Sequence, residues 1–555
     1  MTIIKGTGAS AGIALGKLAF YPAKTGLSEE ITVEKTDNPD KELARFEEAK
    51  AKTIDRLKQL YEKALKDVGE THASIFEIHQ IMLDDEDYCD SIKKSIVEKK
   101  VKAEYAIKTT AGEFAEMFAA MDDEYMQGRA ADVKDISDQL IRTLGGASDL
   151  SMIFSEPVIL AADDLAPSET IQLDREKMLG FITMGGGVNS HTAILARMMG
   201  IPAIVGVGSQ LNIDFNGKDT AIDGLTGYIF IEPDEKTLSS LKVKAEEEKD
   251  KKEHMQKYKG RDNVTLDGQR IDVFANIGSV SDIDAVLEND AGGIGLFRSE
   301  FIYLSSVDYP GEEEQFNTYK TAAEKMAGKK VIIRTLDIGA DKQIGYFDLP
   351  HEENPALGFR AIRICLDRPD IFKTQLRAIL RASVFGKISI MFPMITSLGE
   401  VLDCKEILNS VKTELDAAGV AYDKDIEIGV MIETPAAVMI SDLLAKEFDF
   451  FSVGTNDLTQ YTLAIDRQNP KLGRFYNPRH KAVIRMIKMA ADNMHKEGKW
   501  IGICGELAGD LEMTETFLAM GIDELSVSPP FILPIRAKVC NTDVSKIKTE
   551  VLNAI

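Results

Sequence analysis

The sequence has 555 residues and a formal net charge of −24 at pH 7. A chain of this length is too long for one ordinary core, so several domains are expected. The negative charge argues against nucleic acid as the main partner, and it would speed encounters with a basic protein. No apolar run reaches membrane-spanning length and the first ten residues lack an apolar core, so a cytoplasmic location without membrane insertion is expected.

The first part of the chain combines short strands with a long helical segment. Residues 1–22 carry short apolar runs broken by glycines, which is typical of strands and turns. Between Pro39 and Pro157 there is no proline, and apolar residues recur at helical spacing on a charged background. Residues 23–145 are therefore predicted to form a helical bundle, inserted between the N-terminal strands and a following α/β domain.

The middle of this bundle carries a candidate docking surface. Residues 75–87, with the sequence IFEIHQIMLDDED, place an apolar helix face beside an acidic end. Such a surface would suit a small basic partner. An internal core face followed by a solvated acidic turn explains the same composition.

Residues 146–234, together with the N-terminal strands, are predicted to form an α/β domain. In this domain a histidine follows a glycine-rich loop. After Gly185–Gly187 come Ser190, a natural N-cap, and His191, in the first turn of the helix that Ser190 would start. Free N–H groups and the helix dipole favour a phosphoryl group there, so His191 is a candidate phospho-acceptor. The alternative is a polar residue that hydrogen-bonds the loop.

The rest of the chain is predicted to form a linker helix and a barrel. Residues 235–260 are dense in Lys and Glu and indicate an exposed linker helix. In residues 261–555 eight apolar runs alternate with helical segments, which predicts a (β/α)8 TIM barrel. The fold class expected is therefore a multidomain α/β protein with an inserted helical bundle. The eight runs are residues 271–275, 293–297, 331–333, 388–392, 428–432, 450–453, 500–503 and 524–527.

Polar residues follow the predicted barrel strands in phase. The C-terminal ends of barrel strands form the active-site mouth, so residues that follow the strands should converge there. Arginine forks suit phosphate or carboxylate oxygens, and two carboxylates with substrate oxygens and waters suit Mg²⁺. The sequence therefore predicts a site for a small phosphorylated anion. The residues are Arg298, Glu300, Arg334, Asp337, Glu433, Asn456, Asp457, Cys504 and Glu506.

Two further residues of this region allow more than one interpretation. Arg467 lies just past the sixth strand and could add a third cation or form a surface salt bridge. Cys504 stands at a strand end between Gly502 and Gly505, where a thiol could donate a proton. Most cysteines in strands are packing residues.

Seven ordered motifs run through the chain. Together they resemble those of the Enzyme I family of phosphoenolpyruvate-protein phosphotransferases, and the resemblance covers nearly the whole chain. They lie at residues 185–193 (GGGVNSHTA), 293–301 (GIGLFRSEF), 334–339 (RTLDIG), 352–360 (EENPALGFR), 431–435 (MIETP), 452–461 (SVGTNDLTQY) and 504–506 (CGE).

The resemblance implies a reaction and a role for each site residue. His191 would take the phosphoryl group of phosphoenolpyruvate and pass it to a histidine of HPr, releasing pyruvate, as the first step of the sugar phosphotransferase system. Cys504 would protonate the enolate carbon, and Glu433 and Asp457 would bind Mg²⁺. The helical bundle would bind HPr, and the barrel would form a homodimer. The implied phosphoenolpyruvate-binding positions are Arg298, Arg334, Asn456, Asp457 and Arg467.

Two alternatives share some of these features. A pyruvate phosphate dikinase or phosphoenolpyruvate synthase needs an ATP-binding domain, but no phosphate loop of the Gly-x4-Gly-Lys type precedes His191. A catalytically idle scaffold predicts lost site residues, whereas every motif position is filled.

Overall fold

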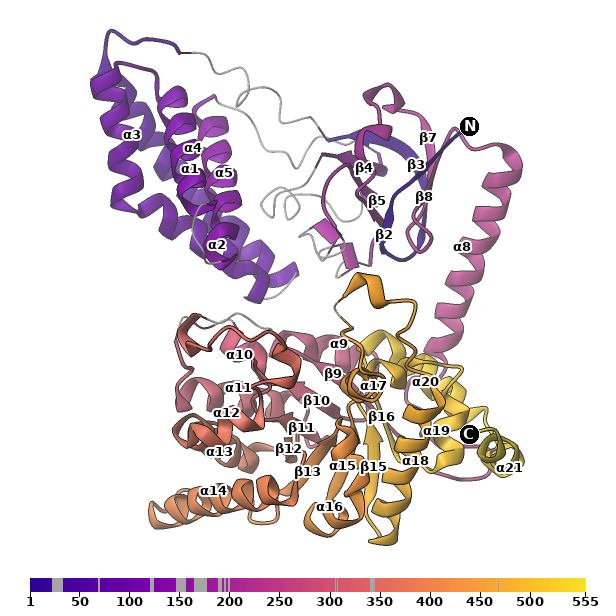
Figure 1. The fold of residues 1–555 in the computed structure, drawn as a ribbon. Coiled ribbons are helices and arrows are strands. Elements are labelled where there is room, and N and C mark those ends of the chain that lie inside the picture. The colour runs from indigo at the N-terminus through magenta and orange to yellow at the C-terminus, as the bar shows by residue number, and fades with distance from the viewer. Residues whose placement is uncertain are drawn as a thin grey trace. The chain divides into compact units, whose positions relative to one another are not determined.

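The computed structural model describes the chain in several ranges. Within them the chain divides into two compact units, Met1–Lys251 and Lys252–Ile555 (Figure 1). Helix α8 (Glu235–Gln256) crosses this division. None of the described helices is both long and apolar enough to cross a membrane. The described residues are 1–21, 33–67, 70–119, 124–145, 156–163, 177–187, 192–193, 196–197, 200–304, 306, 308–339, 345–467 and 469–555.

The first unit contains an eight-stranded sheet in the order β1-β8-β7-β3-β4-β5-β6-β2. The four strands from β3 to β6 are parallel, and the remaining pairs are antiparallel. Phe181 and Ile182 belong to apolar clusters on opposite faces, as the alternation of a strand requires. The strands are β1 (Thr2–Lys5), β2 (Thr7–Ser10), β3 (Ile13–Phe20), β4 (Val158–Ala162), β5 (Met178–Thr183), β6 (Ala203–Val205), β7 (Asp219–Asp223) and β8 (Tyr228–Ile231).

Five helices are described in the chain between the neighbouring strands β3 and β4, so the predicted insertion of a helical bundle is confirmed. The first helix begins where the Asn38 side chain accepts a hydrogen bond from the Lys41 N–H (3.1 Å), and the third where Asp85 accepts one from the Tyr88 N–H (2.8 Å). The helices are α1 (Pro39–Asp67), α2 (Glu70–Asp84), α3 (Glu86–Lys99), α4 (Ala103–Ala119) and α5 (Glu124–Leu144).

The second unit is a closed barrel of eight parallel strands, and each strand coincides with one of the eight predicted runs. Helices cover the outside of the barrel (Figure 1). Most strand residues are buried, because the helices pack on one face of the strands and side chains fill the interior on the other. The strands are β9 (Asp272–Ile277), β10 (Ile294–Arg298), β11 (Val331–Arg334), β12 (Ile388–Phe392), β13 (Glu427–Ile432), β14 (Phe450–Val453), β15 (Trp500–Ile503) and β16 (Glu524–Val527).

An apolar cluster fills part of the barrel interior. It contains Leu296, Met391, Met431 and Phe450, and the Phe450 ring stacks on Trp500 with centroids 4.6 Å apart. Trp500 is the only tryptophan of the chain. The helices of this unit are α9 (Ile283–Glu288), α10 (Glu300–Leu304), α11 (Glu312–Lys325), α12 (Ile362–Asp367), α13 (Pro369–Ala382), α14 (Leu398–Ala417), α15 (Pro435–Met439), α16 (Ser441–Glu447), α17 (Thr455–Leu463), α18 (Lys481–Lys496), α19 (Thr514–Met520), α20 (Ile532–Cys540) and α21 (Val544–Ala554).

Candidate active site at the barrel mouth

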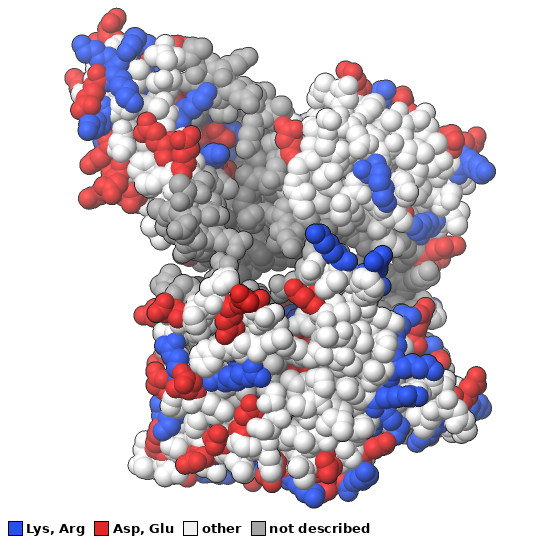
Figure 2. Space-filling view, viewed as in Figure 1, with Lys and Arg blue, Asp and Glu red and all other residues white. Residues whose placement is uncertain are grey.

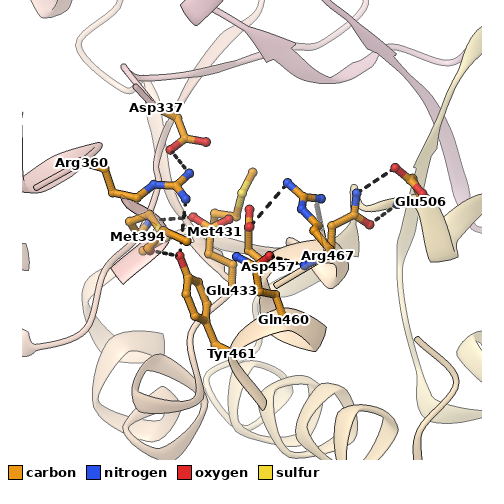
Figure 3. A network of polar contacts seen from close by, with 12 residues as sticks. Asp337, Arg360, Met394, Met431, Glu433, Asp457, Gln460, Tyr461, Arg467 and Glu506 are labelled. Carbon is orange, nitrogen blue, oxygen red and sulfur yellow. Dashed lines mark hydrogen bonds and ion pairs between the residues drawn. The ribbon is translucent and has the colours of Figure 1, made fainter. Parts of the chain in front are cut away.

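A buried ionic network lies beyond the end of β11. The Arg334 guanidinium contacts the carboxylates of Glu300 (2.5 Å) and Asp337 (2.9 Å). The other oxygen of Asp337 accepts a hydrogen bond from Arg360 Nη2 (2.8 Å), so one carboxylate joins two arginines. Figure 3 shows Arg360 directed at Asp337. The four side chains are at most 7% exposed.

The ion pairs of this network keep its two arginines charged. Burial alone lowers the pKa of Arg334, but the negative charges of Asp337 and Glu300 outweigh burial and raise it above its usual value. The same balance, led by Asp337, raises the pKa of Arg360. Both guanidinium groups therefore stay charged in a buried site, where an ion is costly unless it is paired.

Neighbouring side chains fix the backbone beside the network. The Ser299 hydroxyl donates to the Arg334 carbonyl oxygen (2.6 Å), and the Gln375 amide donates to Ser299 Oγ (3.0 Å). These bonds join the end of β10, the end of β11 and helix α13. Arg298, which ends β10 and pairs in register with Arg334, is partly buried and forms no ion pair with any described residue.

Two acidic residues lie beyond the ends of β13 and β14, at the same mouth of the barrel. Glu433 follows β13 and is 1% exposed, and Asp457 lies in the first turn of α17 and is 7% exposed. Glu433 Oε1 accepts a hydrogen bond from the Met394 N–H (2.6 Å). Burial, followed by repulsion from Asp457 and Asp337, raises the pKa of Glu433 to about 8. Buried carboxylates that repel one another are stabilised by a cation.

The two carboxylates fit Mg²⁺ as part of a larger ligand set. Glu433 and Asp457 offer hard oxygen ligands, which this ion prefers. Within the described ranges no group of three His, Cys, Asp or Glu side chains could hold a metal ion alone. The remaining ligands would come from water and from substrate oxygens, which is usual for Mg²⁺ beside a phosphate.

A small pocket opens beside these carboxylates. The Asn456 amide donates to Glu506 Oε1 and accepts from the Glu506 N–H, both at 3.1 Å, which ties the ends of β14 and β15 together. Arg467 Nη2 lies 3.6 Å from Asp457 Oδ1 (Figure 3). The pocket measures about 220 Å³ and is lined by Asn456, Asp466, Arg467, Leu472, Gly473, Tyr476 and Glu506.

Cys504 follows β15 and is 2% exposed. Its Sγ lies 3.7 Å from the Val453 carbonyl oxygen. Burial, assisted by the neighbouring acidic groups of Glu524 and Glu433, raises the pKa of the thiol to about 12, although Ser452 and Arg334 act in the opposite direction. The thiol therefore keeps its proton at neutral pH, as a proton donor must.

His191 lies outside the described residues, together with residues 188–190. The loop that leads to it is described: the Thr183 hydroxyl donates to the Gly185 carbonyl oxygen (2.8 Å), and Gly186 has a φ of +79°. Beyond it, Ala193 and Ala196 are helical and fully buried in the sheet core. These contacts hold both flanks of the loop against the sheet.

The structure places the other predicted site residues at or just after the ends of barrel strands, except Arg467, which helix α17 separates from the sixth strand. Two further residues, to which the sequence analysis assigned no role, join the site. Arg360 donates to the Tyr461 hydroxyl (3.4 Å), and that hydroxyl donates to the Ala356 carbonyl oxygen (2.5 Å). Neither Arg360 nor Tyr461 directly follows a strand. Their places in the motifs at residues 352–360 and 452–461 are the only signal that could have indicated them.

Three family models match successive parts of the chain. They describe the N-terminal part of a PEP-utilising enzyme (residues 5–129), its mobile domain (residues 154–227) and its PEP-binding domain (residues 252–544). The last of these alone covers more than half of the chain.

Curated relatives match along nearly their full length. A phosphoenolpyruvate-protein phosphotransferase of Priestia megaterium is 45% identical over 540 residues, which are 97% of this chain and 93% of that protein. The protein of the same name from Bacillus subtilis is 44% identical and covers 97% and 94%. That of Haemophilus influenzae is 43% identical and covers 98% and 95%. The chain therefore belongs to the PEP-utilising enzymes, and among them to the family of phosphoenolpyruvate-protein phosphotransferases.

Proposed function

We propose that this protein moves the phosphoryl group of phosphoenolpyruvate to His191 and then to a histidine of HPr, releasing pyruvate, as the first step of the sugar phosphotransferase system. One observation carries the proposal: buried, charged arginines, two acidic residues and a protonated thiol meet at the mouth of one barrel. This set matches the needs of a substrate that has a phosphate, a carboxylate and a carbon that must gain a proton.

The arginines bind and orient the substrate. Arg298, Arg334 and Arg467 supply planar cations for phosphate and carboxylate oxygens, and Asn456 adds a neutral donor. Transfer of a phosphoryl group depends mainly on in-line positioning and on neutralised charge. Mg²⁺ held by Glu433 and Asp457 would supply further neutralisation when it is bound.

The chemical step uses two groups of the chain. A neutral nitrogen of His191 attacks phosphorus, the bond from phosphorus to the enol oxygen breaks, and the enolate of pyruvate is left. Cys504 then gives its S–H proton to the enolate carbon, so a C–H bond forms and a thiolate remains. Protonation at carbon removes the enolate and favours the forward direction.

Different parts of the chain would carry the phosphohistidine, bind HPr and bind phosphoenolpyruvate. Residues 1–22 and 146–234 form the phosphohistidine domain, and residues 23–145 bind HPr. Residues 235–260 link them to residues 261–555, which bind phosphoenolpyruvate and form the homodimer. Since His191 must be loaded in one place and unloaded in another, we expect large domain motions with the linker helix as the hinge. A cytoplasmic location completes the proposal.

The HPr-docking surface is narrower than the run at residues 75–87 suggests. Phe76 and Leu83 are buried in the bundle core, which leaves Ile81 (69% exposed) and the acidic residues after it. Asp84 contacts Lys50 (3.1 Å), and Asp85 caps α3. Acidic and basic side chains alternate on the face of the bundle in Figure 2, so a basic partner would be guided by local groups of charge.

The proposal is tested by incubating the protein with phosphoenolpyruvate labelled in its phosphoryl group and with Mg²⁺. We expect acid-labile, base-stable label on His191, because phosphohistidine has this stability, and no label on a His191→Ala variant. Peptide mapping locates the label. Label from ATP in the absence of phosphoenolpyruvate would contradict the proposal and point to a dikinase, and a folded protein without any label would point to a scaffold.

Removal of the Cys504 thiol should separate the two half-reactions. In a Cys504→Ala variant, we expect loading of His191 from phosphoenolpyruvate to slow by about a hundredfold or more, the usual contribution of a general acid. Phosphoryl exchange between loaded enzyme and HPr should stay unchanged, because no carbon is protonated in that step. Rapid-quench measurement of each half-reaction gives the comparison. Equal loss of both would refute the proton-donor role.

Charge reversal on the bundle tests the docking surface without disturbing the cap of α3. We expect Glu86→Lys combined with Asp87→Lys to weaken HPr binding by about tenfold at low salt and by less at high salt, since salt screens exposed charges. Calorimetric titration at two salt concentrations gives the affinities. The matched control is Glu98→Lys at the other end of α3. The same loss in the control, or none at either salt concentration, would place HPr elsewhere.

A further inference from the structure

A further buried acid, which the proposed mechanism does not use, lies inside the barrel below the mouth. Glu524 is the first residue of β16 and is 1% exposed. Two glycines leave room for it: a Cβ on Gly502 would lie 1.8 Å from its Oε2, and a Cβ on Gly295 would lie 2.4 Å from its Oε1. Gly502 and Cys504 are two residues apart on one strand and so face the same side. Glu524 therefore lies one layer below the Cys504 thiol.

Several buried polar atoms of the described residues in this part of the barrel have no hydrogen-bond partner. Among the described residues, none forms a hydrogen bond of acceptable geometry with either carboxylate oxygen of Glu524 or with Ser526 Oγ, Ser452 Oγ or Asn276 Oδ1. All five atoms are buried. Such atoms usually bind internal water, and a site lined by several of them can hold it. The barrel interior thus has a polar section beside its apolar cluster, to which Cys504 also belongs.

This polar section is tied to Cys504. The Asn276 amide donates to the Cys504 carbonyl oxygen (2.9 Å) and to the Ser526 carbonyl oxygen (3.1 Å), which joins β9 to β15 and β16. Ser452 pairs in register with Gly502, and its hydroxyl lowers the pKa of the Cys504 thiol. The Ser526 hydroxyl lies beside Glu524, because a Cβ on Gly295 would meet both groups at 2.4 Å. Hydroxyl groups therefore lie beside the acid and beside the thiol.

Burial and the charges around Glu524 together shift its pKa. Burial, followed by the negative charge of Asp272 on β9, raises the pKa of Glu524 well above its usual value. Lys330, which precedes β11 and pairs with Glu427 (2.6 Å), and the Ser526 hydroxyl act in the opposite direction without reversing the effect. Cys504 faces it from β15 as a neutral thiol. Burial thus favours the protonated form of Glu524.

We propose that Glu524 holds the proton that restores Cys504 after each turnover, and that the hydroxyl groups of Ser526 and Ser452, with bound water, carry it. The inference rests on the proton-donor role proposed for Cys504. Glu524 acts through Cys504 and does not touch the substrate. A reservoir is needed because Cys504 is only 2% exposed and has little direct contact with bulk water.

The proton transfers balance over one cycle. Donation to the enolate carbon leaves a Cys504 thiolate. The O–H bond of Glu524 then breaks, each hydroxyl or water on the path accepts one proton and passes on another, and the S–H bond forms again. The thiolate readily takes up this proton, because burial disfavours a thiolate and raises the pKa of the Cys504 thiol to about 12. The Glu524 carboxylate regains a proton from bulk water beside Asp272, whose side chain is 47% exposed.

A Glu524→Gln variant tests this role, since it keeps the size and neutrality of the side chain but removes the acidic proton. With phosphoenolpyruvate, Mg²⁺ and HPr in excess, we expect a first turnover of pyruvate release as fast as in the unmodified protein, because Cys504 starts protonated. Later turnovers should be slower by about tenfold or more. The steady-state rate of the unmodified protein should fall as pH rises through the pKa of Glu524, and this inflection should be missing from the variant.

Controls separate a proton reservoir from a structural role. Ser526→Ala should give the same fast first turnover with slower later ones. Glu400→Gln should match the unmodified protein, because among the described residues Glu400 bonds only Thr396 (N–H to Oε2, 2.6 Å) and Ser397 (N–H to Oε2, 2.9 Å) at the start of helix α14. Trp500 fluorescence reports folding of the barrel. An unchanged steady state and pH profile in Glu524→Gln, or equal slowing of first and later turnovers, would overturn the inference. Failure of the unmodified protein to release pyruvate would instead contradict the proposed phosphotransfer.

Discussion

The shared carboxylate of Asp337 is the contact on which the barrel mouth depends. It joins Arg334 and Arg360, which come from different segments and which would be costly to bury alone. Removing one partner of such a buried set typically costs about 3–5 kcal/mol, because the remaining charges are left unpaired. The network therefore fixes the arginines before substrate arrives, and preorganised charge is worth most where charge develops during reaction.

Burial has different electrostatic effects on the polar groups at successive depths of the barrel. Around Arg334 it strengthens ion pairs, whereas at Glu433 it raises the pKa and leaves a site suited to a cation. At Cys504 and Glu524 burial raises the pKa and favours the protonated acid, as the proposed proton transfers require. A parallel barrel can hold different polar groups at different depths, because each strand places alternate side chains in successive interior layers.

Much of the fold could be predicted from the sequence, because a strand covered on both faces needs a continuous apolar run and the chain has eight of them in its second half. The rule that strand ends form the barrel mouth then indicated Arg334, Glu433 and Cys504. The pairing of Asp337 with Arg360 could not be predicted, since the two are 23 residues apart and meet only through loop conformation. Glu524 gave no signal either: a glutamate at a strand start is usually exposed, and only the structure shows that Gly295 and Gly502 make room for it.

The most direct test of the preformed network is the affinity for phosphoenolpyruvate of an Asp337→Asn variant, measured by calorimetry with Mg²⁺ in a His191→Ala background that blocks transfer. If Asp337 only adds negative charge near an anion site, its removal should tighten binding. Because Asp337 holds Arg334 and Arg360 in place, we predict binding weaker by about tenfold or more, with no change for Asp370→Asn on the exposed first turn of α13. Unchanged or tighter binding by Asp337→Asn would contradict this account.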